Sequence, residues 1–206
     1  MTNLITLTRQ QLNPAVIASF ATLIGADSTT TATLVNYAIP LLLGSRGATK
    51  PGIAALVAVM AANESKGLAA DGRRPLDTGL ALIAALYGGK AELMARALAG
   101  ATGTTISAAT RALALAMFLV AGAATTMLAA EARPIARHQV AALLIASQTA
   151  AVAALPVGLQ SAIASLPGLA GLYVVTGARR RSLAGLLLAG LVGTIVLFGV
   201  LLGSAW

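Results

Sequence analysis

The spacing of apolar residues predicts helices from the start of the chain onward. After a short lead-in over residues 1–12, Asn13 and Pro14 form a typical helix start, because asparagine caps free amides and proline suits the first helical position. Apolar side chains then recur at helical spacing as far as Gly25, which is expected to end this helix. The apolar face of this first predicted helix carries Val16, Phe20, Leu23 and Ile24.

Two further helices are predicted within residues 1–62. Asp27 or Ser28 can cap the second helix, and Gly44 is expected to end it. Pro40 lies inside the second helix and is expected to kink it or to split off its last turn. The third helix begins near Pro51 and faces the same core. The apolar positions are Leu34, Tyr37, Ala38, Leu41 and Leu42 in the second helix, and Ile53, Leu56, Val57 and Met60 in the third.

A polar stretch at 63–77 is the best candidate for a domain boundary. It reads NESKGLAADGRRPLD and holds two glycines, a proline and three of the six acidic residues, as linkers often do. We therefore predict an N-terminal helical repeat over 1–62, followed by a second helical repeat with a helical extension over 78–178. The second repeat begins with a short helix that Gly88 and Gly89 are expected to end.

The two predicted repeats are related by an offset of 78 residues. Under this offset the helix–glycine–helix pattern of Gly25 to Gly44 falls on Gly103 to Gly122. Identities in an alanine-rich chain can arise from composition, but here both helix-ending glycines coincide. We therefore predict a tandem duplication. The matched identities are Ala21 with Ala99, Gly25 with Gly103, Ala38 with Ala116, Leu41 with Leu119 and Gly44 with Gly122.

Two further stretches carry no charged residue. The first, 112–130, lies between Arg111 and Glu131, and the second, 140–178, is broken by Pro156 and Pro167 into short predicted helices. Hydropathy alone admits both as membrane spans. Their many alanine, glycine, serine and threonine residues favour buried helices of a soluble module instead.

The segment from Leu183 to Gly203 is the strongest membrane signal in the chain. It has 21 uncharged residues, and a helix of that length spans about 31 Å, close to the hydrocarbon core of about 30 Å. No polar face remains for solvent, which disfavours a buried core helix. Arg179, Arg180 and Arg181 precede it, and the positive-inside rule then orients the bulk of the chain to the cytoplasm, with Trp206 as an interfacial anchor.

Small residues line one face of this predicted transmembrane helix. Gly185, Ala189 and Gly193 lie four apart, and Gly199 and Gly203 repeat the spacing. Such rows allow two helix backbones to approach closely, so they are candidates for helix–helix packing. The alternative is that membrane helices simply contain many glycines.

Composition favours a helical protein more firmly than a membrane protein, because much of the apolar excess is alanine. The chain is 58% hydrophobic, whereas about 45–50% is usual for soluble proteins, and aromatic residues amount to only 3%. Few aromatic and scattered β-branched residues favour an all-α fold, here a tandem small helical bundle plus a C-terminal transmembrane helix. The absence of cysteine excludes disulfides and thiolate metal sites. The net charge of +8 includes the arginine triplet beside an apolar run, which favours anionic lipid over nucleic acid as the partner.

No catalytic, cofactor or metal site is predicted. The single histidine, His138, has Arg133 and Arg137 as neighbours and no carboxylate placed to orient it, so a solvated or headgroup-facing role is favoured. The run GATGTT at 100–105 lacks the Lys-Ser/Thr ending of a phosphate loop and is better explained as a helix stop and restart. The acidic residues suggest caps, a linker and helix ends: Asp27, Glu64, Asp71, Asp77, Glu92 and Glu131.

The chain resembles a bacterial family, the domain of unknown function 937 or YidB-like helical proteins. The likeness rests on LNPAVIASFATLIGADSTTTATLVNYAIPLLLGS at 12–45, GGKAELMARALAGATG at 88–103 and LLIASQTAAVAALPVGLQSAI at 143–163, and it covers nearly all of residues 12–171. The resemblance implies alanine-, glycine- and leucine-rich helical domains, sometimes with a carboxy-terminal membrane segment. It implies no activity and no catalytic residue. This chain departs from the family in a more hydrophobic second half.

Together these observations predict a non-enzymatic scaffold or interaction protein. It is expected to be a single-pass protein of the bacterial inner membrane, with its N-terminus in the cytoplasm and a basic flank and transmembrane helix over 179–206. Its expected partners are membrane lipid and either further copies of itself or other protein helices. The alternative is a multi-spanning pore or transporter with additional spans in 112–178. Arginines on both sides of the first candidate span give no consistent orientation, which disfavours this alternative.

Overall fold

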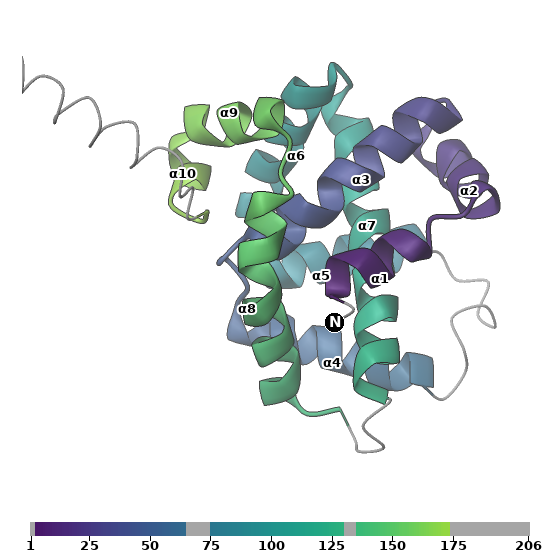
Figure 1. The fold of residues 1–206 in the computed structure, drawn as a ribbon, viewed down its shortest axis with the longest axis vertical. Coiled ribbons are helices and arrows are strands. Elements are labelled where there is room, and N and C mark those ends of the chain that lie inside the picture. Colours follow the sequence, from purple (N-terminus) through teal and green to yellow (C-terminus); the bar gives the residue numbers. More distant parts are fainter. Residues whose placement is uncertain (1–2, 65–74, 130–134, 174–206) are drawn as a thin grey trace, which may run out of the picture. The chain divides into compact units, whose positions relative to one another are not determined.

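The computed structural model describes residues 3–64, 75–129 and 135–173, and over these ranges it contains ten helices and no strand. The all-α prediction is therefore confirmed. The described residues form one compact unit that ends at Tyr173 (Figure 1). The helices are α1 (Leu4–Gln10), α2 (Pro14–Ile24), α3 (Ser28–Gly44), α4 (Lys50–Glu64), α5 (Pro75–Tyr87), α6 (Lys90–Thr102), α7 (Ile106–Ala129), α8 (Arg137–Ala153), α9 (Val157–Ser165) and α10 (Pro167–Ala170).

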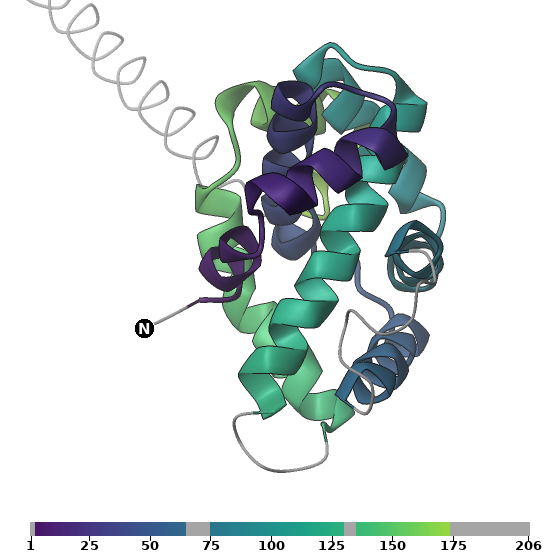
Figure 2. The same cartoon turned by 90° about the vertical axis from the view of Figure 1, so that its right-hand side faces the viewer.

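Helix α7 forms the centre of the core. It contacts α1 to α6 and also α8. Figure 2 shows it running along the unit, with the purple helices α1 and α2 on one side and the blue helices α4 and α5 on the other. Most of its side chains are buried, and many are alanines that let neighbouring backbones approach closely. The uncharged run predicted at 112–130 thus supplies the centre of the unit.

Helix α7 also has the length and apolar composition of a membrane span. Among the described helices it is long and apolar enough to cross a bilayer by itself, with a mean hydropathy of 2.0 over its most apolar window. Helices α8 and α9 are long and apolar enough only when taken together, and they are bent by 108° at the break between them. A buried core helix has similar length and composition, and 78% of the α7 window is buried within the unit.

The predicted boundaries of the first helices are largely confirmed. The amide of Val16 donates to Oδ1 of Asn13 at 2.9 Å, so Asn13 caps α2. Gly25 ends α2 in the left-handed conformation, with φ of 79°. Asp27 caps α3, because its Oδ1 accepts the amide of Thr30 at 2.9 Å. Local capping chemistry was therefore a sufficient guide to these ends.

One local expectation was wrong, and one of the two effects expected of Pro40 is excluded. The amino-terminal lead-in contains a helix, α1, which begins after Asn3, whose Oδ1 accepts the amide of Thr6 at 2.8 Å. Leu4 is buried on this helix, so the core stabilises a segment too short to be helical alone. In α3, the helix continues through Pro40 to Gly44, so the proline does not split off the last turn.

The predicted boundary at 63–77 does not separate two units. Helix α4 continues to Glu64 and α5 begins at Pro75, so both ends of the predicted linker are helical, and 65–74 lie outside the described residues. Helix α3 packs against α7 and α8, and α4 packs against α5 and α7. The two predicted repeats therefore share one core up to Tyr173.

The second half repeats the capping pattern of the first at the predicted offset. Gly103 ends α6 in the left-handed conformation with φ of 67°, as Gly25 ends α2. Thr105 caps α7 by accepting the amide of Ala108 at 3.1 Å, and it matches Asp27 under the same offset. The run at 100–105 is thus a helix stop and restart. The tandem duplication itself stays a prediction, since caps of this kind recur in unrelated helices.

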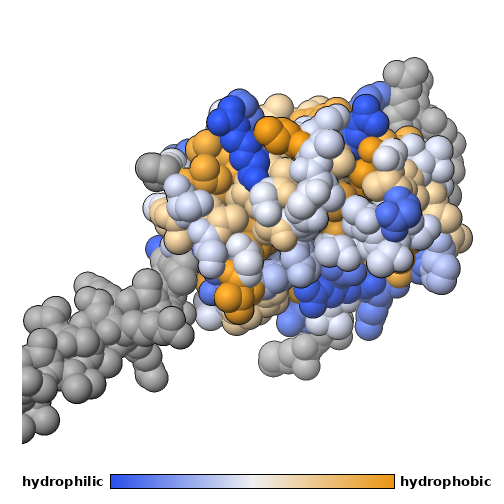
Figure 3. Space-filling view, turned by 90° about the horizontal axis from the view of Figure 1, so that it is seen from above, coloured by the Kyte–Doolittle hydropathy of each residue, from blue (hydrophilic) through white to orange (hydrophobic). Residues whose placement is uncertain are grey.

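Large apolar side chains are rarely exposed on the described unit. Seen from above, apolar side chains form separate patches among polar and weakly polar ones (Figure 3). Two of the exposed residues, Ile145 and Val157, lie on α8 and α9 and are exposed by 65% and 78%. The other two are Leu80 and Ile106.

Candidate functional site

The residues predicted to orient and pack the membrane segment lie outside the described part of the chain. The candidate site lies where the described chain ends, at Tyr173, and nine residues, 174–182, lie between it and the predicted membrane segment. The predicted residues in question are Arg179, Arg180, Arg181, Gly185, Ala189, Gly193, Gly199, Gly203 and Trp206.

The last two described residues are bound to the carboxy-terminal end of α3. The hydroxyl of Tyr173 donates to the carbonyl of Leu41 at 2.6 Å, and the side chain is only 4% exposed. The amide of Arg46 donates to the carbonyl of Leu172 at 2.9 Å. The chain is therefore fixed to a core helix just before it continues toward the predicted membrane segment.

A second tyrosine donates a hydrogen bond to a backbone carbonyl at the end of α3. A helix leaves its last four carbonyls without helical partners, and when these are buried they need other donors. The hydroxyl of Tyr87, at the end of α5, donates to the carbonyl of Leu42 at 2.9 Å. Nε2 of Gln148 on α8 approaches the carbonyl of Ser45 at 3.5 Å. Helices α5 and α8 are thus each connected by a side chain to the end of α3 or to the residue directly after it.

The turn between α3 and α4 is held by its own hydroxyl groups. Oγ of Ser45 accepts the amide of Gly47 at 3.1 Å. The hydroxyl of Thr49 donates to the carbonyl of Ala85 at 2.8 Å and accepts the amide of Gly52 at 3.1 Å. These bonds fix the turn on α5, which places the exposed side chains of this turn at defined positions.

Burial shifts the acidity of both tyrosines at this site. Loss of hydration raises the pKa of Tyr87 and of Tyr173 above the ordinary value near 10, because the charged form is disfavoured in the core. For Tyr173, repulsion from an ionised Tyr87 raises the pKa further, and the hydrogen bond with Ser45 opposes the shift. Both hydroxyls therefore stay protonated and act as donors at neutral pH.

Removing both hydroxyls should change stability in a pH-dependent way. Below pH 10, the Tyr87→Phe, Tyr173→Phe double variant should have a lower free energy of unfolding than the native chain. The loss should be about 1–3 kcal/mol for each buried carbonyl that is left without a full set of donors. In the unfolded chain tyrosine ionises near pH 10, so the native contribution is fully present below that pH and is lost as pH rises above it. Melting curves at pH 7 and at pH 11 should therefore differ more for the native chain than for the variant.

Tyr37→Phe is the matched control for this prediction. Tyr37 is half-buried on α3, and the substitution leaves both tyrosine bonds at the end of this helix in place. If the Tyr37 variant lost as much stability at pH 7 as the double variant, the bonds to the α3 carbonyls would not explain the loss.

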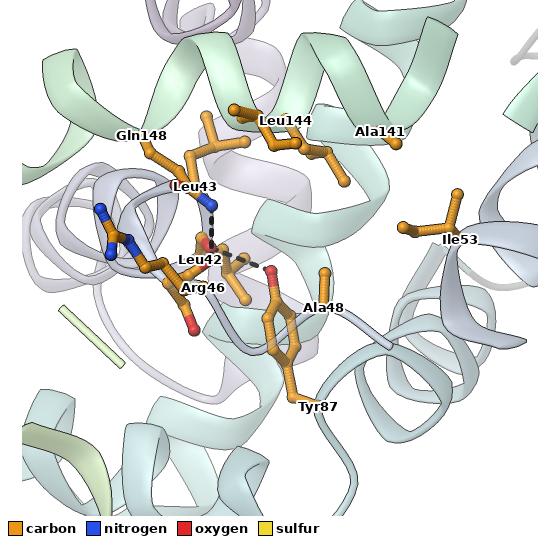
Figure 4. A pocket seen from close by; sticks show the side chains of 11 residues that line it. Leu42, Leu43, Arg46, Ala48, Ile53, Tyr87, Ala141, Leu144 and Gln148 are labelled. Carbon is orange, nitrogen blue, oxygen red and sulfur yellow. Dashed lines mark hydrogen bonds between the residues drawn. The ribbon is translucent and has the colours of Figure 1, made fainter. Parts of the chain in front are cut away.

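A cavity of about 180 Å³ lies beside this helix end (Figure 4). Figure 4 shows Arg46 and Gln148 at one end and Ile53 at the other. Arg46 and Ile145 are exposed, so the cavity opens at a surface with one cation and one large apolar side chain. The cavity is lined by Leu42, Leu43, Ser45, Arg46, Ala48, Ile53, Tyr87, Ala141, Leu144, Ile145 and Gln148.

A second, open groove runs between α2 and α3. Its volume is about 630 Å³, and its lining is polar on the α3 side. No charged side chain lines it. The lining residues are Pro14, Ile17, Ser28, Thr29, Ala32, Thr33, Asn36 and Tyr37.

The described ionisable residues have structural partners or exposed positions. Hydrogen bonds from the Thr30 hydroxyl and amide lower the pKa of Asp27, as expected for a cap. Glu92, in the first turn of α6, pairs with Arg96 at 2.6 Å. His138 is exposed in the first turn of α8. Within the described ranges, no group of three or more His, Cys, Asp or Glu side chains is arranged to hold a metal ion.

Sequence reasoning missed the hydroxyl network at the end of α3. No hydrogen-bonding role at this helix end was predicted for Tyr87, Tyr173 or Gln148. A signal was present, because a tyrosine in an apolar stretch needs a hydrogen-bond partner once it is buried. The partners are backbone carbonyls, which carry no sequence signature.

Comparison with family models, with curated proteins and with solved structures finds no match for this chain. The resemblance to the YidB-like family therefore stays a prediction.

Proposed function

We propose that this chain is a membrane-tethered helical scaffold or interaction protein without catalytic activity. The observation that carries the proposal is the uncharged segment from Leu183 to Gly203, preceded by Arg179, Arg180 and Arg181. That segment has the length of a transmembrane helix, and the triplet favours a cytoplasmic location for the bulk of the chain in the bacterial inner membrane. The compact unit would then be held at the cytoplasmic face.

The attachment of Tyr173, the last described residue, to the core supports this proposal. The described unit closes at Tyr173, which is hydrogen-bonded to α3, and only residues 174–182 separate it from the proposed span. A short connection from a fixed point keeps the helical unit near the membrane. We further propose self-association through the row of small residues Gly185, Ala189 and Gly193, where two such helices could pack closely.

Removal of residues 182–206 tests the tether. The truncated chain should move from the membrane fraction to the soluble fraction, because the proposed span provides the main apolar contact with lipid. Fractions should be washed at high salt, so that binding through the arginine triplet alone is removed. A chain lacking only 204–206 is the control and should stay in the membrane.

A multi-spanning protein is the alternative, and the length and hydropathy of α7 favour it. In that case the truncated chain would remain in membranes after the high-salt wash, which would contradict a single tether. The chain has no native cysteine, so single cysteines can report the exposure of each segment. Thr126→Cys and Ser161→Cys are suitable because both positions are exposed on the described unit, whereas Thr125 is buried. The tether predicts labelling of both from the cytoplasmic side.

A further inference from the structure

The surface around the cavity at the end of α3 combines a cationic and an apolar side chain, and a second cation follows four positions along the chain. Arg46 and Lys50 are exposed in and directly after the turn that follows α3. Ile145 is exposed by 65% on α8 and lines the same cavity as Arg46. We call the surface formed by these three residues the α3–α8 face.

The charge around this face is of one sign. No acidic residue occurs between Ser28 and Ala62 or anywhere after Glu131. Helices α3 and α8 and the turn after α3 therefore carry no carboxylate, and the acidic residue of α4, Glu64, lies 14 positions after Lys50. A cationic surface with an exposed isoleucine is complementary to the headgroup region of an anionic bilayer, where lysine and arginine contact phosphates and apolar side chains enter the acyl boundary.

Only a short stretch of sequence separates the residues next to this face from the proposed tether. The amide of Arg46 is bonded to the carbonyl of Leu172, so the face adjoins the last described residues. Arg179 follows Tyr173 by six positions, and an extended chain adds at most about 3.6 Å per residue. The Cα atoms of these two residues are therefore no more than about 22 Å apart.

We propose that the α3–α8 face docks on the anionic surface of the membrane that holds the chain. Arg46 and Lys50 contact lipid phosphates, and Ile145 enters the boundary between headgroups and acyl chains. This inference deepens the proposed tether and rests on it. Docking gives the helical unit a defined orientation, and the open groove between α2 and α3 stays accessible to partners, because no residue of the α3–α8 face lines it.

The test uses the full chain in vesicles with a single fluorescent label. Ile145→Cys carries an environment-sensitive dye, and Thr22→Cys, exposed on α2, is the matched control. In vesicles that contain phosphatidylglycerol, the dye at position 145 should shift to shorter wavelength and resist quenching by iodide. In vesicles of phosphatidylcholine alone it should do neither. At 1 M salt, where the screening length is about 3 Å, the shift in anionic vesicles should be lost.

Charge variants identify the groups responsible. Arg46→Gln and Lys50→Gln together should abolish the shift, while the backbone bond from residue 46 to Leu172 remains possible. Flotation is measured on every sample, because the proposed tether predicts flotation with both vesicle types regardless of these variants. Failure to float would therefore overturn the tether, whereas flotation without a shift would overturn docking alone.

Two other outcomes would also overturn docking. Equal shifts in neutral and anionic vesicles would show that charge does not select the surface. A shift that grows with protein concentration but not with lipid charge would show that a second copy of the chain covers the α3–α8 face.

Discussion

Gly79→Ala should destabilise the helical unit by about 3 kcal/mol or more, the upper end of the usual range for overpacked cores. A Cβ atom at this position would lie 1.9 Å from the carbonyl oxygen of Ala114 and 2.5 Å from its carbonyl carbon. Both atoms belong to the backbone of α7, so no side chain can rotate to make room. Helix α5 would have to move away from the centre of the core.

The expected loss corresponds to a melting temperature lowered by about 6–12 °C in a chain of this length. It can be measured by circular dichroism of the full chain in mild detergent. Gly100→Ala is the matched control, because Gly100 lies in α6 and a Cβ atom added there would have no neighbouring side chain or other helix within 4 Å. That substitution should stabilise the chain by about 0.5–1 kcal/mol, since alanine is the better helix former. Equal melting temperatures for the two variants would contradict close packing of α5 on α7.

Leu34→Ala should lower the free energy of unfolding by about 2–5 kcal/mol, because it leaves a cavity in a fully buried part of α3. Leu34 is 0% exposed, and α3 packs against both α7 and α8. The loss can be measured by urea unfolding, followed through the helical signal. It tests directly that the helix from the first predicted repeat is part of the shared core.

Leu80→Ala removes the same atoms from a more exposed position and is the control for this cavity effect. Leu80 is 37% exposed on α5, so solvent or small movements can fill the space. Its substitution should cost clearly less than that of Leu34. Similar losses of unfolding free energy at the two positions would mean that the burial of Leu34 does not determine the effect of its substitution.

Local signals in the sequence were sufficient for most helix ends. Asn13 and Asp27 cap helices through their own side chains, and Gly25 adopts the left-handed conformation that ends a helix. Pro156 and Pro167 separate α8, α9 and α10 as predicted. These features depend on residues within one turn, so a single sequence carries the information for them.

Features that depend on distant contacts were less accessible. Helix α1 owes its stability to burial against α3, α7 and α8. The polar stretch at 63–77 predicted a domain boundary, although the two halves of the described chain share one core. The hydroxyl of Tyr173 pairs with a carbonyl 132 positions earlier. Pairing of a side chain with a backbone atom leaves no complementary residue in the sequence that could reveal it.

The bond between Tyr173 and Leu41 has a mechanical consequence. A pull on the chain beyond residue 173 acts first on this hydroxyl and on the bond between Leu172 and Arg46. The load therefore passes directly into α3, and the small helices α9 and α10 are bypassed. While these two bonds hold, tension on the chain beyond residue 173 would move the whole unit as one body rather than unfold it from its end.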